Sequence, residues 1–138
     1  MGKSMILTTK TKYALEAVNY LIDNYNGKPL KLREIAKNLN IPLIYLEQIF
    51  SKLNKTGFVK STKGKGGGFS PGSNINNATI LDFVNILENK KDMSKCIKEP
   101  ESCNKSKNCK LRLIFIKVDK KIKDLLSSYR IKEARETR

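Results

Sequence analysis

The spacing of apolar side chains predicts three helices in the N-terminal part of the chain. In residues 8–25 the apolar positions recur every three or four residues, which is the spacing of one helix face. A second pattern of this kind covers residues 32–39, and a third begins after Pro42 and stops at Gly57. Asn40 tolerates the left-handed backbone conformation that a tight turn between helices requires. We therefore expect a helix-turn-helix in which each helix buries one face.

A β-prone segment and a basic, glycine-rich segment follow the third helix. Residues 58–62 favour a strand, residues 63–68 are K-G-K-G-G-G, and Phe69-Ser70 favours a return strand. This order is typical of a hairpin whose tip lets the backbone approach a phosphate closely while lysines supply charge. A flexible surface loop is the alternative, and the phosphate-binding pattern G-x-x-x-x-G-K-[ST] is absent. After a helix-turn-helix, we interpret the hairpin as the wing of a winged helix.

Helix ends are predicted from polar residues that precede apolar runs. Thr8 or Thr9 can cap the first helix, and Asn77 can cap a fourth helix whose apolar positions are Ile80, Phe83, Val84 and Leu87. Residues 89–109 are polar and charged, so we expect a loop there.

The C-terminal segment has one apolar stripe that extends over about five helical turns, from residue 111 to residue 129. A helix of this kind must bury its stripe, and a symmetry-related partner helix is the natural place because palindromic operators require a two-fold protein. Packing against its own domain, with Leu7 and Leu15, is the alternative. We expect residues 132–138 to fray.

The amino-acid composition indicates what kind of partner the protein binds. The 138 residues contain 28 Lys and Arg against 13 Asp and Glu, so the net charge is +15 and the pI is about 9.8. Such an excess favours a polyanion, and nucleic acid is preferred over a membrane because no apolar run approaches the roughly 18–20 residues of a span. The N-terminus has no apolar core of a secretion signal, so we expect a cytoplasmic protein.

These patterns predict a mainly α fold in which a winged helix-turn-helix carries a small β-hairpin and is followed by a long dimerisation helix. We divide the chain into a DNA-binding domain, a connecting helix, a cysteine-bearing loop and a dimerisation helix, at residues 5–75, 76–90, 91–109 and 110–132. No histidine, nucleotide loop or catalytic constellation is evident, so we expect no enzyme. A basic structural or RNA-binding protein stays open as another class, and its binding would be indifferent to sequence.

The only cysteines of the chain are Cys96, Cys103 and Cys109, spaced C-x6-C-x5-C. Zinc sites prefer C-x2–4-C pairs, and an all-thiolate iron–sulfur site needs a fourth cysteine. Thiolates nevertheless suit iron–sulfur centres, and neighbouring lysines favour the thiolate form and offset a cluster's negative charge. Three reduced surface thiols, or one disulfide with a spare thiol, are the alternative, and the spacing does not choose between them. The lysines concerned are Lys95, Lys98, Lys105, Lys107 and Lys110.

From Met5 onward, residues 5–130 resemble the IscR-type regulators, the Rrf family of bacterial winged-helix repressors that includes NsrR and CymR. The resemblance is carried by the stretches M-I-L-T-T-K-T-K-Y-A-L, I-P-L-I-Y-L-E-Q-I-F-S-K-L and K-G-K-G-G-G-F, and by the cysteine loop. It implies a homodimeric transcription factor with a long C-terminal dimerisation helix. It also implies that the loop cysteines bind an iron–sulfur cluster, 2Fe–2S in many members and 4Fe–4S in some.

The resemblance also implies the DNA contacts by position. Tyr45, Glu47 and Gln48 would lie near base edges, where glutamine can pair with adenine and glutamate can accept from cytosine. The other candidates, one on the same helix and the rest in the wing, are Lys52, Lys63, Lys65, Gly66 and Gly67.

The fourth ligand departs from the family pattern. In IscR a histidine follows the third cysteine by three residues, and here that residue is Arg112. In NsrR an aspartate near the start of the first helix ligates the cluster of the other subunit; here that position is Lys12, and Glu16, one turn on, is the candidate. The alternative for Glu16 is a solvated surface glutamate. A second hypothesis keeps DNA binding without a cluster, with thiol oxidation or a partner enzyme of cysteine metabolism as the signal.

Overall fold

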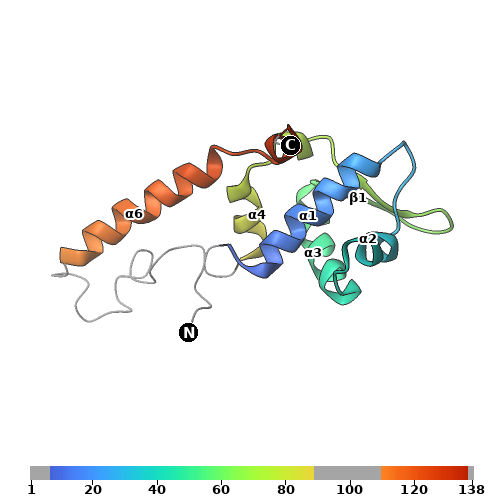
Figure 1. Cartoon of the computed structure of the whole chain (residues 1–138), viewed down its shortest axis with the longest axis horizontal. Helices are drawn as coiled ribbons and strands as arrows, with labels where there is room; N and C mark the ends of the chain where they lie inside the picture. The colour runs from blue at the N-terminus through green and yellow to red at the C-terminus, as the bar shows by residue number, and fades with distance from the viewer. Residues whose placement is uncertain (1–6, 89–109, 137–138) are drawn as a thin grey trace.

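The computed structural model describes residues 7–88 and 110–136 and is mainly helical, with one antiparallel hairpin (Figure 1). The helices and hairpin expected from the apolar pattern are all present, which confirms the fold class. In chain order the elements are α1 (Thr9–Asn24), α2 (Leu32–Leu39), α3 (Leu43–Thr56), β1 (Val59–Thr62), β2 (Gly68–Pro71), the 3-10 turn η1 (Ile75–Asn77), α4 (Ile80–Leu87), α6 (Lys110–Ser127) and α7 (Ile131–Glu136).

The turn between α2 and α3 has the geometry that the sequence predicts. Asn40 adopts the left-handed conformation, with φ of 56°. The backbone N–H of Ile41 donates to the carbonyl of Ala36 at 3.0 Å, and the Ile41 side chain is buried. Pro42 occupies the position just before α3, and Gly57 ends α3 with φ of 85°. Together these residues hold α2 and α3 as a helix-turn-helix.

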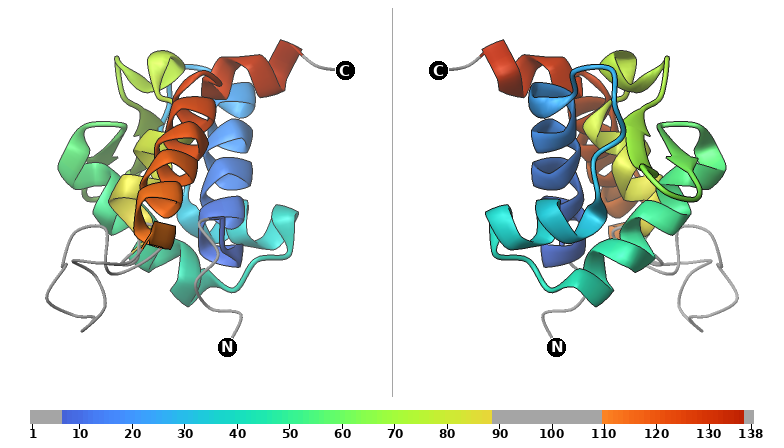
Figure 2. Two further views of the ribbon diagram at one scale, coloured as in Figure 1. Left: turned by 90° about the vertical axis from the view of Figure 1, so that its left-hand side faces the viewer. Right: turned by 90° about the vertical axis from the view of Figure 1, so that its right-hand side faces the viewer.

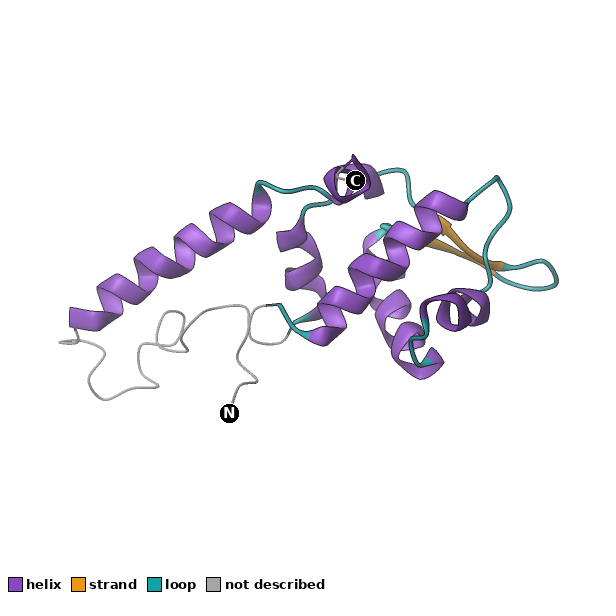
Figure 3. Cartoon of the chain, viewed as in Figure 1, coloured by secondary structure: helices purple, strands orange, loops and turns teal. Residues whose placement is uncertain are grey.

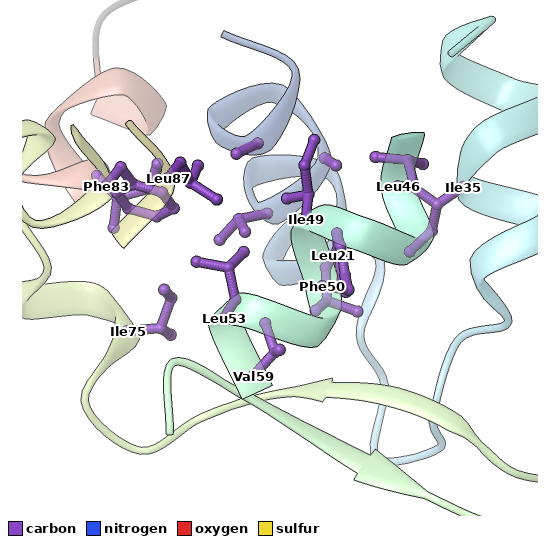
Figure 4. Packing of buried hydrophobic residues seen from close by; sticks show 14 of the residues in the cluster. Leu21, Ile35, Leu46, Ile49, Phe50, Leu53, Val59, Ile75, Phe83 and Leu87 are labelled. Atoms are coloured by element: carbon purple, nitrogen blue, oxygen red, sulfur yellow. The ribbon is translucent and has the colours of Figure 1, made fainter. Parts of the chain in front are cut away.

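The hydrophobic core lies where α1, α3 and α4 meet (Figure 4). Each of these helices contributes one buried face, as the three- and four-residue spacing requires. The aromatic rings of Phe58 and Phe83 stack with their centroids 5.9 Å apart, which joins the start of the wing to α4. The largest fully buried side chains include Leu21, Ile35, Leu46, Ile49, Phe50, Leu53, Val59, Ile75, Phe83 and Leu87.

The wing is held by backbone pairing on both sides of β2 (Figure 3). β1 and β2 pair in an antiparallel register from Val59 opposite Pro71 to Thr62 opposite Gly68. Leu30 pairs with Phe69 on the other edge, with N–H to O distances of 2.9 and 2.7 Å. A Cβ atom at Gly68 would overlap the carbonyl group of Leu30, so the glycine there permits the close approach of the third segment.

Of the predicted helix caps, the one at Asn77 is wrong and the one at Thr8 is confirmed in position only. Asn77 belongs to the 3-10 turn, and α4 is instead capped by Thr79. Thr79 and Asp82 form a reciprocal capping box: the Asp82 N–H donates to the Thr79 hydroxyl at 3.1 Å, and the Thr79 N–H donates to the Asp82 carboxylate at 2.8 Å. Asn77 lies too early in the chain to reach these two backbone donors. Thr8 occupies the cap position of α1 but makes no side-chain cap hydrogen bond there. Its hydroxyl donates to the carboxylate of Glu88 instead.

The C-terminal segment forms two helices. α6 lies at one end of the long axis of the molecule and the wing lies at the other (Figure 1). α6 ends at Ser127, and α7 follows after a short break, so the expectation that residues 132–138 fray is wrong for residues 132–136. Ile131 is fully buried in the core, and its N–H donates to the carbonyl of Ala78 at 2.8 Å. This anchor draws the chain back onto the winged helix and orders α7.

Candidate nucleic-acid interface

α3 has a buried face and a face that no other described element covers. Leu46, Ile49, Phe50 and Leu53 point into the core (Figure 4). Exposed residues at spacings of four, three and four lie along the middle of the opposite face because the helix turns 100° per residue. These four exposed residues are Ile44, Gln48, Ser51 and Lys55.

The α3 residues predicted to contact DNA lie on this face or at its edges. Gln48 lies in the middle, while Glu47 is exposed on one side. Tyr45 lies at the other edge and is 42% exposed. Its ring packs edge-on against Tyr13 of α1, with the centroids 5.9 Å apart and the planes at 80°. This contact restricts the directions that the Tyr45 hydroxyl can take. Lys52, at the same edge, is partly buried.

The wing presents its lysines to solvent. Lys63, Lys65 and Gly66 are exposed at the tip. Gly67 is buried, and a Cβ atom there would overlap the carbonyl oxygen of Thr62. Its N–H donates to the carbonyl of Gly64 at 3.0 Å, which closes the turn. The structure thus supplies a folding reason for glycine at position 67 in addition to the predicted approach to DNA.

The wing and α3 are joined through aromatic packing. The ring of Phe69 in β2 meets the ring of Phe50 in α3 edge-on, with the centroids 5.0 Å apart. Edge-to-face contact of this kind is a favoured aromatic geometry. Because Phe50 is fully buried, a shift of α3 is transmitted directly to the base of the wing. This ring contact therefore fixes β2 of the wing against α3.

The cysteine cluster proposed from the sequence lies outside the described residues, because Cys96, Cys103 and Cys109 all fall within 89–109. Within residues 7–88 and 110–136, no group of three His, Cys, Asp or Glu side chains could hold a metal ion. Glu16 is exposed on α1.

Sequence reasoning missed Glu88, which directly precedes the cysteine segment. Its carboxylate accepts hydrogen bonds from the hydroxyls of Thr8 and Thr11, both at the start of α1. Thr11 is fully buried. The beginning of the cysteine segment is therefore attached to the helix whose Tyr13 packs on the recognition helix. Glu88 lies 80 positions after Thr8 and 77 positions after Thr11. Local sequence patterns do not pair residues so far apart, so only the fold could show this contact.

Two adjacent helices joined by a tight turn, followed by a basic hairpin packed on the second helix, define a winged helix-turn-helix protein. The family model "Rrf2: Iron-dependent Transcriptional regulator" matches residues 7–136. The chain belongs to the Rrf2 family and is a transcriptional regulator that binds DNA, as the sequence indicated.

The similarity to curated relatives extends over nearly the whole chain. The HTH-type transcriptional regulator IscR of Pectobacterium atrosepticum is 31% identical over 129 residues, which are 94% of this chain and 78% of that protein. A putative HTH-type transcriptional regulator of Haemophilus influenzae is also 31% identical, over 94% of this chain and 85% of its own length. Both are named as regulators rather than enzymes, which agrees with the expectation from the sequence.

Solved structures have the same fold. CymR, the global cysteine regulator of B. subtilis, has a TM-score of 0.73 and 26% identity, covering 96% of this chain and 97% of that one. IscR of T. potens has a TM-score of 0.72 and 24% identity, covering 94% and 85%. In the part of the chain that the structure describes, none of the helices is sufficiently long and apolar to cross a membrane.

Proposed function

We propose that this regulator is a homodimer that reads a two-fold DNA operator and changes its affinity with the state of an iron–sulfur cluster held by Cys96, Cys103 and Cys109. The family model's description as iron-dependent and the IscR relatives support the cluster. The exposed apolar stripe of α6 is the observation that carries the homodimer. The division of the chain into residues 5–75, 76–90, 91–109 and 110–132 belongs to the same proposal.

A line of large apolar side chains on α6 is exposed to solvent in the isolated chain. The helix packs on α4. Asp119, about 100° around the helix from Val118, is buried, and its carboxylate meets the Lys123 ammonium at 2.9 Å. A line of large apolar side chains along one helix normally lies against another element, since leaving it in water forgoes the free energy of burial. An identical helix of a second copy would cover the stripe. The exposed members on α6 are Leu111, Ile114, Val118 and Leu125, and Tyr129 continues the line beyond the helix.

The donor set suits a cluster and not a zinc knuckle. Three thiolates are soft ligands that fit iron–sulfur centres, most simply a 2Fe–2S cluster, with 4Fe–4S as the other form. Because the chain has no histidine, a complete site would need an oxygen ligand, an exogenous thiol or a residue from elsewhere in the dimer. Glu16 is the proposed oxygen ligand. A bound cluster would supply a redox-sensitive group that reacts with oxidants or nitric oxide.

Contacts among the described residues suggest how a change in the cysteine loop would be transmitted to the DNA-binding face. The loop begins directly after Glu88, whose carboxylate holds Thr8 and Thr11 of α1. α1 in turn packs on α3, and Tyr13 contacts Tyr45. A loop rearrangement that pulls on Glu88 would therefore change the position of α1 relative to the recognition helix.

A second reading drops the cluster, and the similarity to CymR favours it. That protein is named as a global cysteine regulator, and its structure covers almost all of this chain. In this reading the three cysteines would be oxidised directly, or a partner enzyme would deliver the signal. Arg112, which stands where IscR has a histidine, is compatible with both readings.

The test is anaerobic purification followed by a visible spectrum and assays of iron and acid-labile sulfide. Cysteine-to-alanine replacement at all three positions should remove the colour, iron and sulfide while the far-ultraviolet circular dichroism and the dimer persist. A wild-type protein that remains colourless after anaerobic reconstitution would overturn the cluster. Reversible oxidation detected by mass, without iron, would then identify the thiol-based reading.

A further inference from the structure

The exposed face of α3 begins with an apolar residue that was not among the DNA contacts predicted from the sequence. Ile44 is 66% exposed, more than any other large apolar side chain among the described residues. It is the second residue of α3, so it lies in the first turn of the recognition helix. In the views of Figures 1 and 2, the start of α3 lies at the edge of the described part of the molecule.

We propose that Ile44 is a specificity-determining residue that contacts the C5 methyl group of a thymine in the major groove. This inference rests on the proposed sequence-specific DNA binding and deepens it. The N-terminal residues of a recognition helix are the ones that reach base edges. In the major groove only thymine presents a methyl group, and apolar side chains read it.

The neighbours of Ile44 favour a base over a protein partner as its contact. One turn further along the same line lies Gln48, and Ser51 and Lys55 follow, so the apolar residue begins a row of polar and basic side chains. A protein-docking patch would instead gather several apolar side chains around it. Single exposed apolar residues are common on protein surfaces, so position on this face, and not exposure alone, carries the argument.

Tyr45 does not cover Ile44, because its ring turns toward α1. The Tyr45 and Tyr13 rings meet edge-on at 5.9 Å, which directs Tyr45 to the edge of α3. The buried side chains Leu46 and Ile49 keep the opposite face of the helix in the core. Ile44 is therefore presented on a rigid helix, with little conformational entropy to lose when it meets a base, because a β-branched side chain has restricted rotamers.

The experiment combines removal of the protein's side chain with removal of the thymine methyl group. Duplexes that the full-length protein enriches from a random-sequence library, under anaerobic conditions, serve as the probe. Each thymine of the enriched site is then replaced in turn by uracil, which differs only by the methyl group. Dissociation constants are measured at one fixed salt concentration for the wild type and for Ile44→Ala.

At one thymine per half-site, uracil should weaken wild-type binding about fourfold, the change expected for one buried methyl-sized group. The same replacement should leave the affinity of Ile44→Ala unchanged. The matched control is Leu113→Ala, which removes a similarly exposed apolar side chain from α6 and should retain the uracil effect. Ile44→Ser, which presents no methyl group, provides a second variant if the helix content of Ile44→Ala falls.

Uracil effects of equal size in the wild type and both Ile44 variants at every position would overturn the thymine contact. An Ile44→Ala variant that binds DNA normally but loses a protein partner would overturn it in favour of protein docking. Failure of the library to yield any enriched sequence would refute the sequence-specific function itself, which is a separate result. A uracil effect that disappears only in the Ile44 variants is the outcome we expect.

Discussion

Replacing Ile114 with aspartate should convert the protein from a dimer into a monomer. Ile114 is 53% exposed in the isolated chain and lies on the α6 stripe together with Leu111, Val118 and Leu125. Ile114 lies about 140° around the helix from the buried Asp119, so the substitution places its charge at an exposed position and leaves that buried position unchanged. It therefore acts on the proposed interface and not on the fold.

The expected loss of dimer stability can be worked from exposure. Full burial of an isoleucine side chain is worth about 1.5–3 kcal/mol, so covering the exposed half contributes roughly 1 kcal/mol. Two-fold symmetry places this side chain twice in the dimer, which doubles the loss to roughly 2 kcal/mol. Two aspartates in an apolar interface add a desolvation cost of several kcal/mol per ion. A total of at least roughly 5 kcal/mol raises the dimer dissociation constant at least roughly a thousandfold.

Sedimentation equilibrium over a range of protein concentrations measures this constant directly. The wild type should have twice the mass of the 15.7 kDa chain, and Ile114→Asp the mass of one chain. The control is Leu113→Asp, which places the same charge on the adjacent residue, 62% exposed and about 100° around the helix from the stripe. The reasoning is refuted if Ile114→Asp sediments as a stable dimer, or if Leu113→Asp dissociates as readily.

Three further predictions test the remaining parts of the structure. Glu88→Ala removes two hydrogen bonds from threonine hydroxyls to one carboxylate, so the free energy of unfolding measured in urea titrations should fall by about 2–3 kcal/mol. Glu88→Gln should lose less. Equal stability of the wild type and both variants would show that the contact does not form in solution. Gly72→Ala would bring a Cβ atom into the backbone carbonyl of Gly57, so the melting temperature should fall by an amount equivalent to at least about 2 kcal/mol, and an unchanged value would contradict the packing at the base of the wing. Lys63→Ala should reduce the slope of log affinity against log salt concentration by about one per protomer, equally for all DNA sequences. Gln48→Ala should instead relax specificity at one base pair. A loss of specificity in Lys63→Ala, or an equal loss of affinity for all sequences in Gln48→Ala, would refute the assignment of the two side chains.

The local pattern of the sequence was sufficient for the elements of the winged helix. The spacing of apolar residues predicted α1, α2, α3 and α4, and the basic glycine-rich segment predicted the hairpin. These features are local, because a helix or a tight turn is specified by residues within a few positions of one another. The left-handed Asn40 shows this well, since the short turn between α2 and α3 required it.

Part of the candidate site was also within reach of the sequence. Tyr45, Glu47 and Gln48 were predicted by position from the family resemblance, and all three are exposed. Ile44 also falls outside the apolar stripe of α3, but it was not among the predicted contacts. Helical periodicity from Gln48, extended one turn back, would have found it.

Contacts between distant segments were decided by the tertiary structure alone. Thr8 satisfies Glu88 and not its own helix, Leu30 pairs with Phe69 as a third strand segment, and Ile131 returns to the core from beyond α6. Each pairing joins residues that are far apart in the chain, and many alternative partners of the same chemical type are available to each. Local pattern specifies which face of an element is apolar, while only the packed fold specifies which partner that face or polar group meets.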